Sequence, residues 1–238
     1  MSSYNAIISN NISNSKEYGI YLFASIGNAI ADNKMSFCRN GLYMVESIRN
    51  TLRSNIMLGN LKNFGAQIRE DYDFGDNDID TSNIVDGKLI YYLVGSSDSI
   101  IDSTSNAGTV YCINCQNITI EDLKLINNTY GIYFLNIKNS TIENSSIIDC
   151  ENGVYLLDTL NSTIENNSVS DCENGIYLLN SVNNILKKNN MLDNRFNFLV
   201  YGNFDNNIDI SNLVYSKPIY YINGNSGIVI DQSSNAAP

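Results

Sequence analysis

The chain has 238 residues, 43% of them hydrophobic, and a formal net charge of −11. Phosphate groups are bound by clustered Lys and Arg, so this acidic balance disfavours nucleic acids and anionic membrane surfaces as partners. No run of 18 apolar residues is present, so no segment is predicted to insert into a membrane. The first ten residues lack the basic and apolar regions of a signal peptide.

A Gly-apolar-Tyr motif recurs along the chain, and within each group its copies are 22 residues apart. The copies begin at Gly19, Gly41, Gly131, Gly153 and Gly175. Residues 139–160 and 161–182 are near copies of each other. A unit this short cannot bury a core alone, so the repeats must stack. Helical repeats need about 33 residues, which leaves a β-solenoid.

Apolar residues recur in columns and alternate with polar residues over short stretches, as β-strands require. One column holds Ile8, Ile30, Leu52, Ile120, Ile142, Ile164 and Leu186. We therefore predict an all-β, single-stranded parallel β-helix of about ten coils, a coil being one 22-residue circuit of the solenoid. It forms one domain, 1–238. The repeated Gly is expected at a corner with positive φ. Asn144 and Asn166 are expected in an inward Asn ladder, where they would be poor glycosylation acceptors.

Two segments, 71–94 and 205–223, break the 22-residue pattern and are predicted to be modified coils. Residues 205–237 repeat residues 76–108, with 18 of 33 identical. The first copy leads straight into another coil, whereas the second stops at Pro238. We expect from this that the sequence is a fragment of a longer repeat protein.

One strand of each coil is apolar on both faces, so its outward side forms what we call the Tyr/Leu stripe. The stripe consists of Tyr111, Tyr133, Tyr155, Tyr177, Leu135, Leu157 and Leu179. An apolar surface of this length is usually covered by something. Three candidates remain open: a loop of the same chain such as 71–94, a protein partner or second copy, and a glycan.

An acidic face is predicted on the outward side of the corner that precedes the Tyr/Leu stripe. It contains Asp149, Glu151, Asp171 and Glu173, with Arg195 in the following coil. Stacking brings these groups within about two strand spacings. They fit a solvated turn, a Ca²⁺ site, or the acid/base pair of a polysaccharide-cleaving enzyme.

Alternating acids in the first modified coil are weak Ca²⁺ candidates. They are Asp71, Asp73, Asp76, Asp78 and Asp80. Their spacing does not match an EF-hand. No other cofactor is predicted. Cys38, Cys150 and Cys172 share an inward column and are expected to be buried thiols, whereas Cys112 and Cys115 form a lone C-x-x-C.

The repeated Asn-Ser-Thr-Ile-Glu-Asn and Gly-Ile-Tyr-Leu units resemble those of NosD-type right-handed parallel β-helix proteins. The segments 78–83, 88–92 and 114–119 resemble the version common in archaeal cell-surface proteins. This resemblance implies right-handed winding and an extracellular or cell-surface location. Family members are often labelled as copper-binding or carbohydrate-related, but this chain has no His.

Together these observations predict a structural or interaction module without catalysis of its own. Its expected partner is a protein, or a second copy, bound through the Tyr/Leu stripe, with glycans as a further possibility. The alternative is a carbohydrate-binding or polysaccharide-cleaving β-helix protein.

Overall fold

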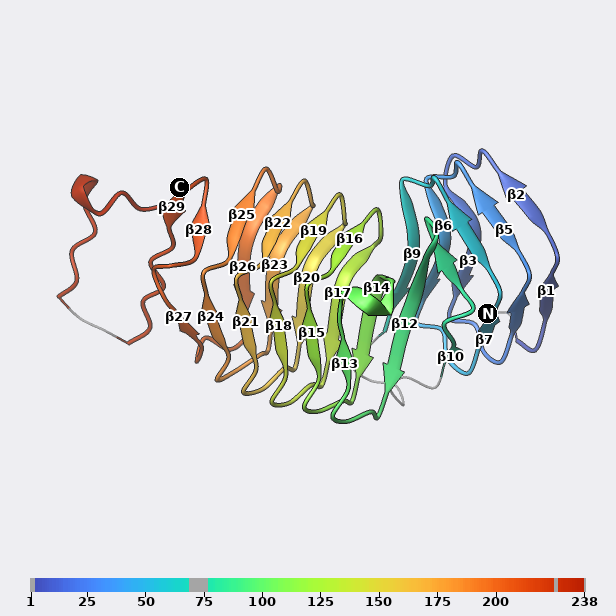
Figure 1. Cartoon of the computed structure of the whole chain (residues 1–238), viewed down its shortest axis with the longest axis horizontal. Coiled ribbons are helices and arrows are strands. Elements are labelled where there is room, and N and C mark those ends of the chain that lie inside the picture. The colour runs from blue at the N-terminus through green and yellow to red at the C-terminus, as the bar shows by residue number, and fades with distance from the viewer. Residues whose placement is uncertain (1–2, 69–76, 225–226, 238) are drawn as a thin grey trace.

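A computed structural model, which describes residues 3–68, 77–224 and 227–237, confirms the predicted parallel β-solenoid. It has about nine coils rather than ten. Figure 1 shows them as two stacks of strands placed one after the other along the long axis. Within the described residues, no helix is long and apolar enough to cross a membrane.

The first stack, which we call the N-block, contains three full coils and the start of a fourth. Its strands are β1 (Ala6–Ile8), β2 (Asn11–Ser13), β3 (Tyr18–Phe23), β4 (Ala29–Ala31), β5 (Lys34–Ser36), β6 (Asn40–Val45), β7 (Thr51–Arg53), β8 (Ile56–Leu58), β9 (Lys62–Gln67), β10 (Asp78–Ile79) and β11 (Ile84–Val85).

The second stack, the C-block, contains the remaining elements. They are β12 (Lys88–Val94), β13 (Ile100–Ile101), the 3₁₀ helix η1 (Ser103–Ser105), β14 (Ala107–Ile113), β15 (Thr119–Glu121), β16 (Lys124–Ile126), β17 (Tyr130–Leu135), β18 (Thr141–Glu143), β19 (Ser146–Ile148), β20 (Asn152–Leu157), β21 (Thr163–Glu165), β22 (Ser168–Ser170), β23 (Asn174–Leu179), β24 (Ile185–Lys187), β25 (Asn190–Leu192), β26 (Phe196–Tyr201), β27 (Asn207–Ile208), β28 (Leu213–Val214), β29 (Lys217–Pro218) and the 3₁₀ helix η2 (Gln232–Ser234).

Consecutive coils pair in parallel register, so equivalent side chains stack. Ile142 of β18 lies beside Ile164 of β21, and both are fully buried. The first coil is an exception, because Ile7 rather than Ile8 pairs with Ile30. The assignment of Ile8 to the inward column was therefore wrong, and its side chain is 50% exposed.

The Asn ladder exists, but it lies one residue later than predicted. In the C-block, the buried Asn167 donates from Nδ2 to Asn189 Oδ1 over 3.0 Å and to the Ile142 carbonyl over 3.0 Å. Asn144 and Asn166 instead occupy exposed corners with φ of 52° and 54°. Their predicted inward position was wrong, and with it the reason to expect poor glycosylation there. Asn tolerates the left-handed conformation that these corners need.

The repeated Gly is selected by space rather than by φ, which corrects our expectation. A Cβ at Gly153 would lie 2.3 Å from Val169 Cγ1 and 2.6 Å from the Gly175 carbonyl oxygen. None of the five repeat glycines is among the residues with positive φ. The close stacking of coils therefore excludes any side chain at this point.

The two modified coils are confirmed, and the first one divides the solenoid into its two blocks. β10 and β11 stack on β7 and β8 as a normal coil, but β11 and β12 then form an antiparallel hairpin. Its turn residues Asp86 and Gly87 have φ of 46° and 81°, as expected for a type I′ turn. The chain therefore reverses, and β12 starts a parallel sheet with β14 that runs through to β26.

The reversal places the end of the N-block against the outward side of the C-block. The amide of Asn63 in β9 donates to the Asn127 carbonyl over 2.6 Å, and the Thr129 amide donates to the Phe64 carbonyl over 3.0 Å. Phe64 is fully buried, and its ring centroid lies 5.4 Å from that of Tyr111. Outward residues of β14 and β17 thus close the open end of the N-block core.

Candidate functional site: a cleft between the two blocks

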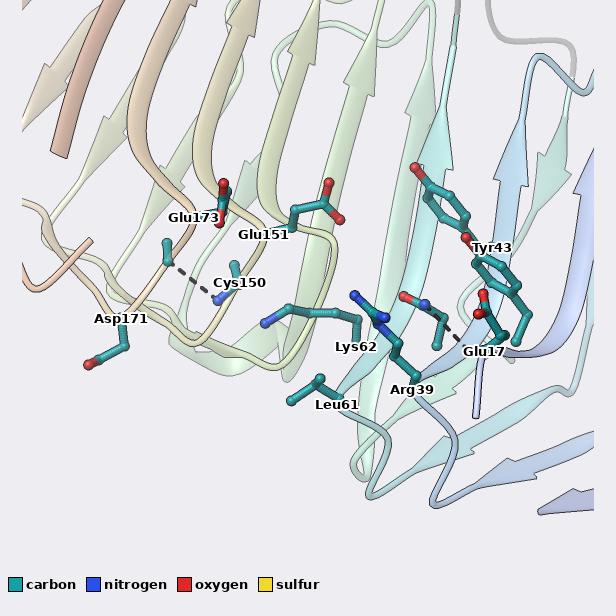
Figure 2. Close-up of a pocket in the computed structure, with 12 residues that line it drawn as sticks. Glu17, Arg39, Tyr43, Leu61, Lys62, Cys150, Glu151, Asp171 and Glu173 are labelled. Atoms are coloured by element: carbon teal, nitrogen blue, oxygen red, sulfur yellow. Dashed lines mark hydrogen bonds between the residues drawn. The ribbon is translucent and has the colours of Figure 1, made fainter. Parts of the chain in front are cut away.

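A cleft of about 660 Å³ lies where the first residues of β3, β6 and β9 face the corners that precede β20 and β23 (Figure 2). We call it the inter-block cleft. Its lining residues are Glu17, Tyr18, Arg39, Asn40, Tyr43, Leu61, Lys62, Cys150, Glu151, Asp171, Cys172 and Glu173. Because the two walls come from different blocks, the hairpin at Asp86 and Gly87 creates the cleft.

The N-block wall is aromatic at one end. Tyr43 stacks on Tyr18 with ring centroids 5.7 Å apart and planes inclined by 4°. Tyr21 stacks on both rings, at 4.5 Å from Tyr18 and 6.1 Å from Tyr43. The Tyr43 hydroxyl donates to Gln67 Oε1 over 3.2 Å, and burial raises the pKa of Tyr43. These contacts hold the ring in a fixed orientation beside the cleft.

The same wall carries two cations. Lys62 reaches across to the C-block, where its Nζ donates to the Asp149 carbonyl over 2.5 Å. Arg39 extends beside it toward the middle of the cleft (Figure 2). Burial raises the pKa of Glu151 on the facing wall, and the positive charges of Lys62 and Arg39 partly offset that rise.

The C-block wall presents carboxylates from consecutive coils. Glu151 and Glu173 extend side by side in Figure 2, whereas Asp171 points away from them. Burial raises the pKa of Glu151, with a smaller contribution from the negative charge of Glu173. Glu173 itself pairs with Arg195 over 2.5 Å, so its charge is partly compensated. The two neighbouring carboxylates therefore differ in their electrostatic surroundings.

The predicted acid/base set is only partly brought together. Glu151, Asp171 and Glu173 line the inter-block cleft. Asp149 contributes its backbone carbonyl to Lys62, and its side chain is exposed. Arg195 is not a lining residue of this cleft, and its guanidinium lies 5.2 Å from the ring centroid of Phe196.

Much of the predicted Tyr/Leu stripe is covered by its own chain. Its side chains face out of the C-block coil as expected, but four of the seven, Tyr111, Tyr133, Leu135 and Leu157, are buried in the N-block core cluster. Tyr155, Tyr177 and Leu179 are half-buried. The cover includes the end of the N-block and also the described part of the 71–94 segment, since Ile79 and Tyr92 belong to the same core cluster as the stripe.

The predicted Ca²⁺ candidates divide into two groups. Asp71, Asp73 and Asp76 lie outside the described residues. Asp78 forms an ion pair with Arg53, and the Asp80 carboxylate lies 3.1 Å from Arg53 Nε. Arg53 therefore already compensates the negative charges of Asp78 and Asp80, which a bound cation would otherwise use. The described part of the chain contains no group of three His, Cys, Asp or Glu placed to hold a metal.

The cysteines are all buried and free, as predicted for Cys38, Cys150 and Cys172. The Cys150 amide donates to Cys172 Sγ over 3.4 Å, which continues the polar ladder through this column. In the C-x-x-C, a hydrogen bond between the two side chains lowers the pKa of Cys115 to about 7, while burial raises that of Cys112.

Sequence reasoning missed the N-block wall of the cleft. Tyr18, Arg39 and Lys62 each occupy an ordinary outward position in the coil, and nothing in the repeat distinguishes them. Their importance depends on the chain reversal, which places them opposite residues 87 or more positions away, as in the contact between Lys62 and Asp149. The Asp-Gly pair at 86–87, a strong hairpin signal, was the available clue.

Comparison with known proteins supports the fold. The family model described as right-handed beta helix region matches residues 90–237. A second family model, described as periplasmic copper-binding protein (NosD), matches residues 1–95. No curated protein matches the chain. Among solved structures, the A-module of the mannuronan C-5 epimerase AlgE6 from Azotobacter vinelandii is 14% identical, with a TM-score of 0.35. That match covers 90% of this chain and 58% of the epimerase module.

The donors present do not fit the copper of the NosD description. The chain has no His, and its five Cys side chains are buried in the solenoid. Copper sites are built from imidazole and thiolate or thioether ligands that converge on one point, and the described residues contain no group of three His, Cys, Asp or Glu placed to hold a metal. The likeness to known proteins therefore concerns the fold. Because the right-handed β-helix model matches more than half of the chain, the protein belongs to the right-handed β-helix family.

Proposed function

We propose that the protein is an extracytoplasmic interaction module that binds carbohydrate in the inter-block cleft and has no catalysis of its own. The observation that carries this proposal is the pairing of a fixed aromatic wall, Tyr18 and Tyr43, with a facing wall of carboxylates. Sugar rings present an apolar C–H face, which packs on aromatic rings, and a rim of hydroxyls, which hydrogen-bond to charged groups. The periplasmic description of the NosD model supports the location.

The size and charge of the cleft narrow the ligand class. Its volume, about 660 Å³, lies within the range of small-ligand sites, roughly 300–1,000 Å³. The lining contains four acids, Glu17, Glu151, Asp171 and Glu173, and two bases, Arg39 and Lys62, so its formal charge is 2 − 4 = −2. This excess of negative charge disfavours uronic acid polymers and favours neutral glycans.

The test is calorimetric titration of the full chain with neutral and uronate oligosaccharides. We expect neutral glycans to bind, and Tyr43→Ala and Glu151→Gln each to weaken their binding by about tenfold or more, equivalent to about 1.4 kcal/mol. Tyr201→Ala, which changes a 67% exposed tyrosine that does not line the cleft, serves as the matched control. Binding that is unchanged in Tyr43→Ala, or limited to uronates, would contradict the proposal.

A second candidate, polysaccharide cleavage, is favoured by one observation. Glu151 has a raised pKa and lies one coil from Glu173, which is paired with a cation, and such a difference between two carboxyls suits an acid and its partner. The same oligosaccharides, incubated with the protein and analysed for new reducing ends, distinguish the two functions. Products that disappear in both Glu151→Gln and Glu173→Gln would replace the binding function by a catalytic one.

A further inference from the structure

Two of the buried thiols, Cys150 and Cys172, line the inter-block cleft from consecutive coils. At two other steps of their column an Asn oxygen accepts from the amide of the preceding coil. Asn60 Oδ1 accepts from the Cys38 amide over 2.8 Å. Asn194 Oδ1 accepts from the Cys172 amide over 2.9 Å. Between the two cleft thiols the acceptor is a sulfur, because the Cys150 amide donates to Cys172 Sγ over 3.4 Å (the dashed line beside Cys150 in Figure 2).

The surroundings of Cys172 favour the ionised form of its sulfur. A neutral thiol is a weak acceptor, whereas a thiolate accepts charge-assisted hydrogen bonds. Lys62 Nζ is held at the carbonyl of Asp149, the residue that precedes Cys150, so its positive charge lies at this edge of the cleft. Hydrogen bonds from the Cys150 thiol and amide, together with the charge of Lys62, lower the pKa of Cys172, although burial opposes this. The hydrogen bond between the two thiols and burial raise the pKa of Cys150.

Cys38 shows what the same column position looks like away from the cleft. Cys38 and Cys172 are each 4% exposed. Their sulfurs make the same local contact, Cys38 to the Ser36 carbonyl over 3.4 Å and Cys172 to the Ser170 carbonyl over 3.2 Å. Cys172 lines the inter-block cleft, whereas Cys38 is not among its lining residues. The two thiols therefore have equal exposure but different access and different electrostatic surroundings.

We infer that Cys172 is a reactive thiol of the inter-block cleft, which takes low-molecular-weight disulfides as a mixed disulfide. The Cys172 thiol first gives its proton to water, and the thiolate attacks one sulfur of the small disulfide. A new S–S bond to Cys172 forms as the S–S bond of the reagent breaks, and the departing thiolate takes a proton from water. Cys172 is oxidised, and the released half of the reagent is reduced to a thiol. Cys150 is a positioning residue that donates to the attacking sulfur.

The cleft has room for the group that this reaction leaves on Cys172. Its volume of about 660 Å³ lies within the range of small-ligand sites, roughly 300–1,000 Å³. Low-molecular-weight disulfides persist in oxidising surroundings outside the cytoplasm. Reactive cysteines occur where a thiol is accessible and lies near positive charge, and Cys172 meets both conditions through the cleft and Lys62. The inference concerns the sulfur chemistry of one wall and does not depend on whether the cleft binds carbohydrate.

The experiment treats the reduced full chain with 4,4′-dithiodipyridine, an uncharged small disulfide, at neutral pH and stops the reaction with acid at intervals. Cleavage after glutamate places Cys38, Cys150 and Cys172 in separate peptides, 18–46, 144–151 and 166–173, so mass spectrometry gives a rate for each thiol. In the native protein we expect Cys172 to react at least about tenfold faster than Cys38, and Cys150 to stay unmodified. In urea the three thiols should react at similar rates, because the difference depends on the fold.

A second arm tests the electrostatic cause. Lys62→Gln should slow the reaction of Cys172 by at least about threefold, whereas Lys34→Gln, which changes an exposed lysine that does not line the cleft, should leave it unchanged. An unchanged rate at Cys38 in the same samples shows that the solenoid is intact. The inference is overturned if Cys172 reacts no faster than Cys38 in the native protein, if Cys150 is the thiol modified, or if Lys62→Gln has no effect on Cys172.

Discussion

At the scale of single residues, the solenoid depends on side chains that form hydrogen bonds with buried backbone groups at the bends, in place of water. Asn167 is the clearest case, since its Oδ1 accepts from the Ser145 amide over 3.0 Å while its Nδ2 donates to the Ile142 carbonyl and to Asn189. These groups are buried, so removing the side-chain amide takes one hydrogen-bond partner from each of them. The neighbouring Asn166 has the same chemistry but lies at an exposed corner.

This contrast gives the first prediction. Asn167→Ala should lower the free energy of unfolding by about 2–4 kcal/mol, because each buried polar group that loses a hydrogen-bond partner costs about 1–3 kcal/mol. The matched control Asn166→Gly, which keeps the left-handed corner accessible, should cost less than about 1 kcal/mol. Urea unfolding followed by circular dichroism measures both. Equal losses in the two variants would show that the inward ladder is not the stabilising one.

At the scale of the strand, residues of the Tyr/Leu stripe cover the open end of the N-block core. Tyr111 of β14 is fully buried against Phe64, Tyr92, Tyr130 and Tyr133. Its ring therefore packs outside the coil that carries it and inside the core of the N-block. One β-strand contributes to two cores, and the block junction relies on its outward face.

We therefore predict that Tyr111→Ala loosens the junction. It should destabilise the protein by about 3–5 kcal/mol, as usual for emptying a buried aromatic site, and speed amide exchange at β9 more than at β21. Tyr111→Phe, which removes only the hydroxyl that accepts from Ala66, should cost about 1–2 kcal/mol. The same truncation at Tyr177, in the same column but half-buried, should leave β9 exchange unchanged. Faster exchange at β9 in Tyr177→Ala would contradict the role of Tyr111 in covering the N-block core.

Tyr111 in β14 and Tyr177 in β23 show which features of the structure can be predicted from the sequence and which cannot. Strict 22-residue spacing places Tyr111 and Tyr177 in one outward column, and that placement is correct, because register propagates from coil to coil. The difference in burial between them comes from the reversal at Asp86 and Gly87, which breaks the spacing and is invisible to a column count. For this reason the sequence does not predict the aromatic wall of the inter-block cleft. The outward position of Glu151, Asp171 and Glu173 can be predicted because these residues follow the repeat.

At the scale of the whole molecule, the two blocks are unequal. The C-block has a core of its own, formed by inward residues from Ile101 to Val214. The N-block core is completed by C-block side chains, among them Tyr111, Tyr133 and Leu157. Separated from the C-block, the three N-block coils would expose Phe64 and Ala66 at an open end, and a stack of so few repeats gains little stability from its remaining interfaces.

Separately produced fragments test this asymmetry. Residues 77–238 should show a β-sheet circular dichroism spectrum and a cooperative thermal transition, whereas residues 1–68 should show neither. Mixing should restore β structure in the shorter fragment, because the hydrogen bonds of Asn63 and Phe64 to the 127–129 corner can form between chains. Adding Tyr111→Ala to the longer fragment should abolish that recovery, while Tyr177→Ala should not. If residues 1–68 alone melted cooperatively at the temperature of the intact chain, the N-block would not need the C-block for its stability. The Tyr/Leu stripe would then cover the N-block core without stabilising it.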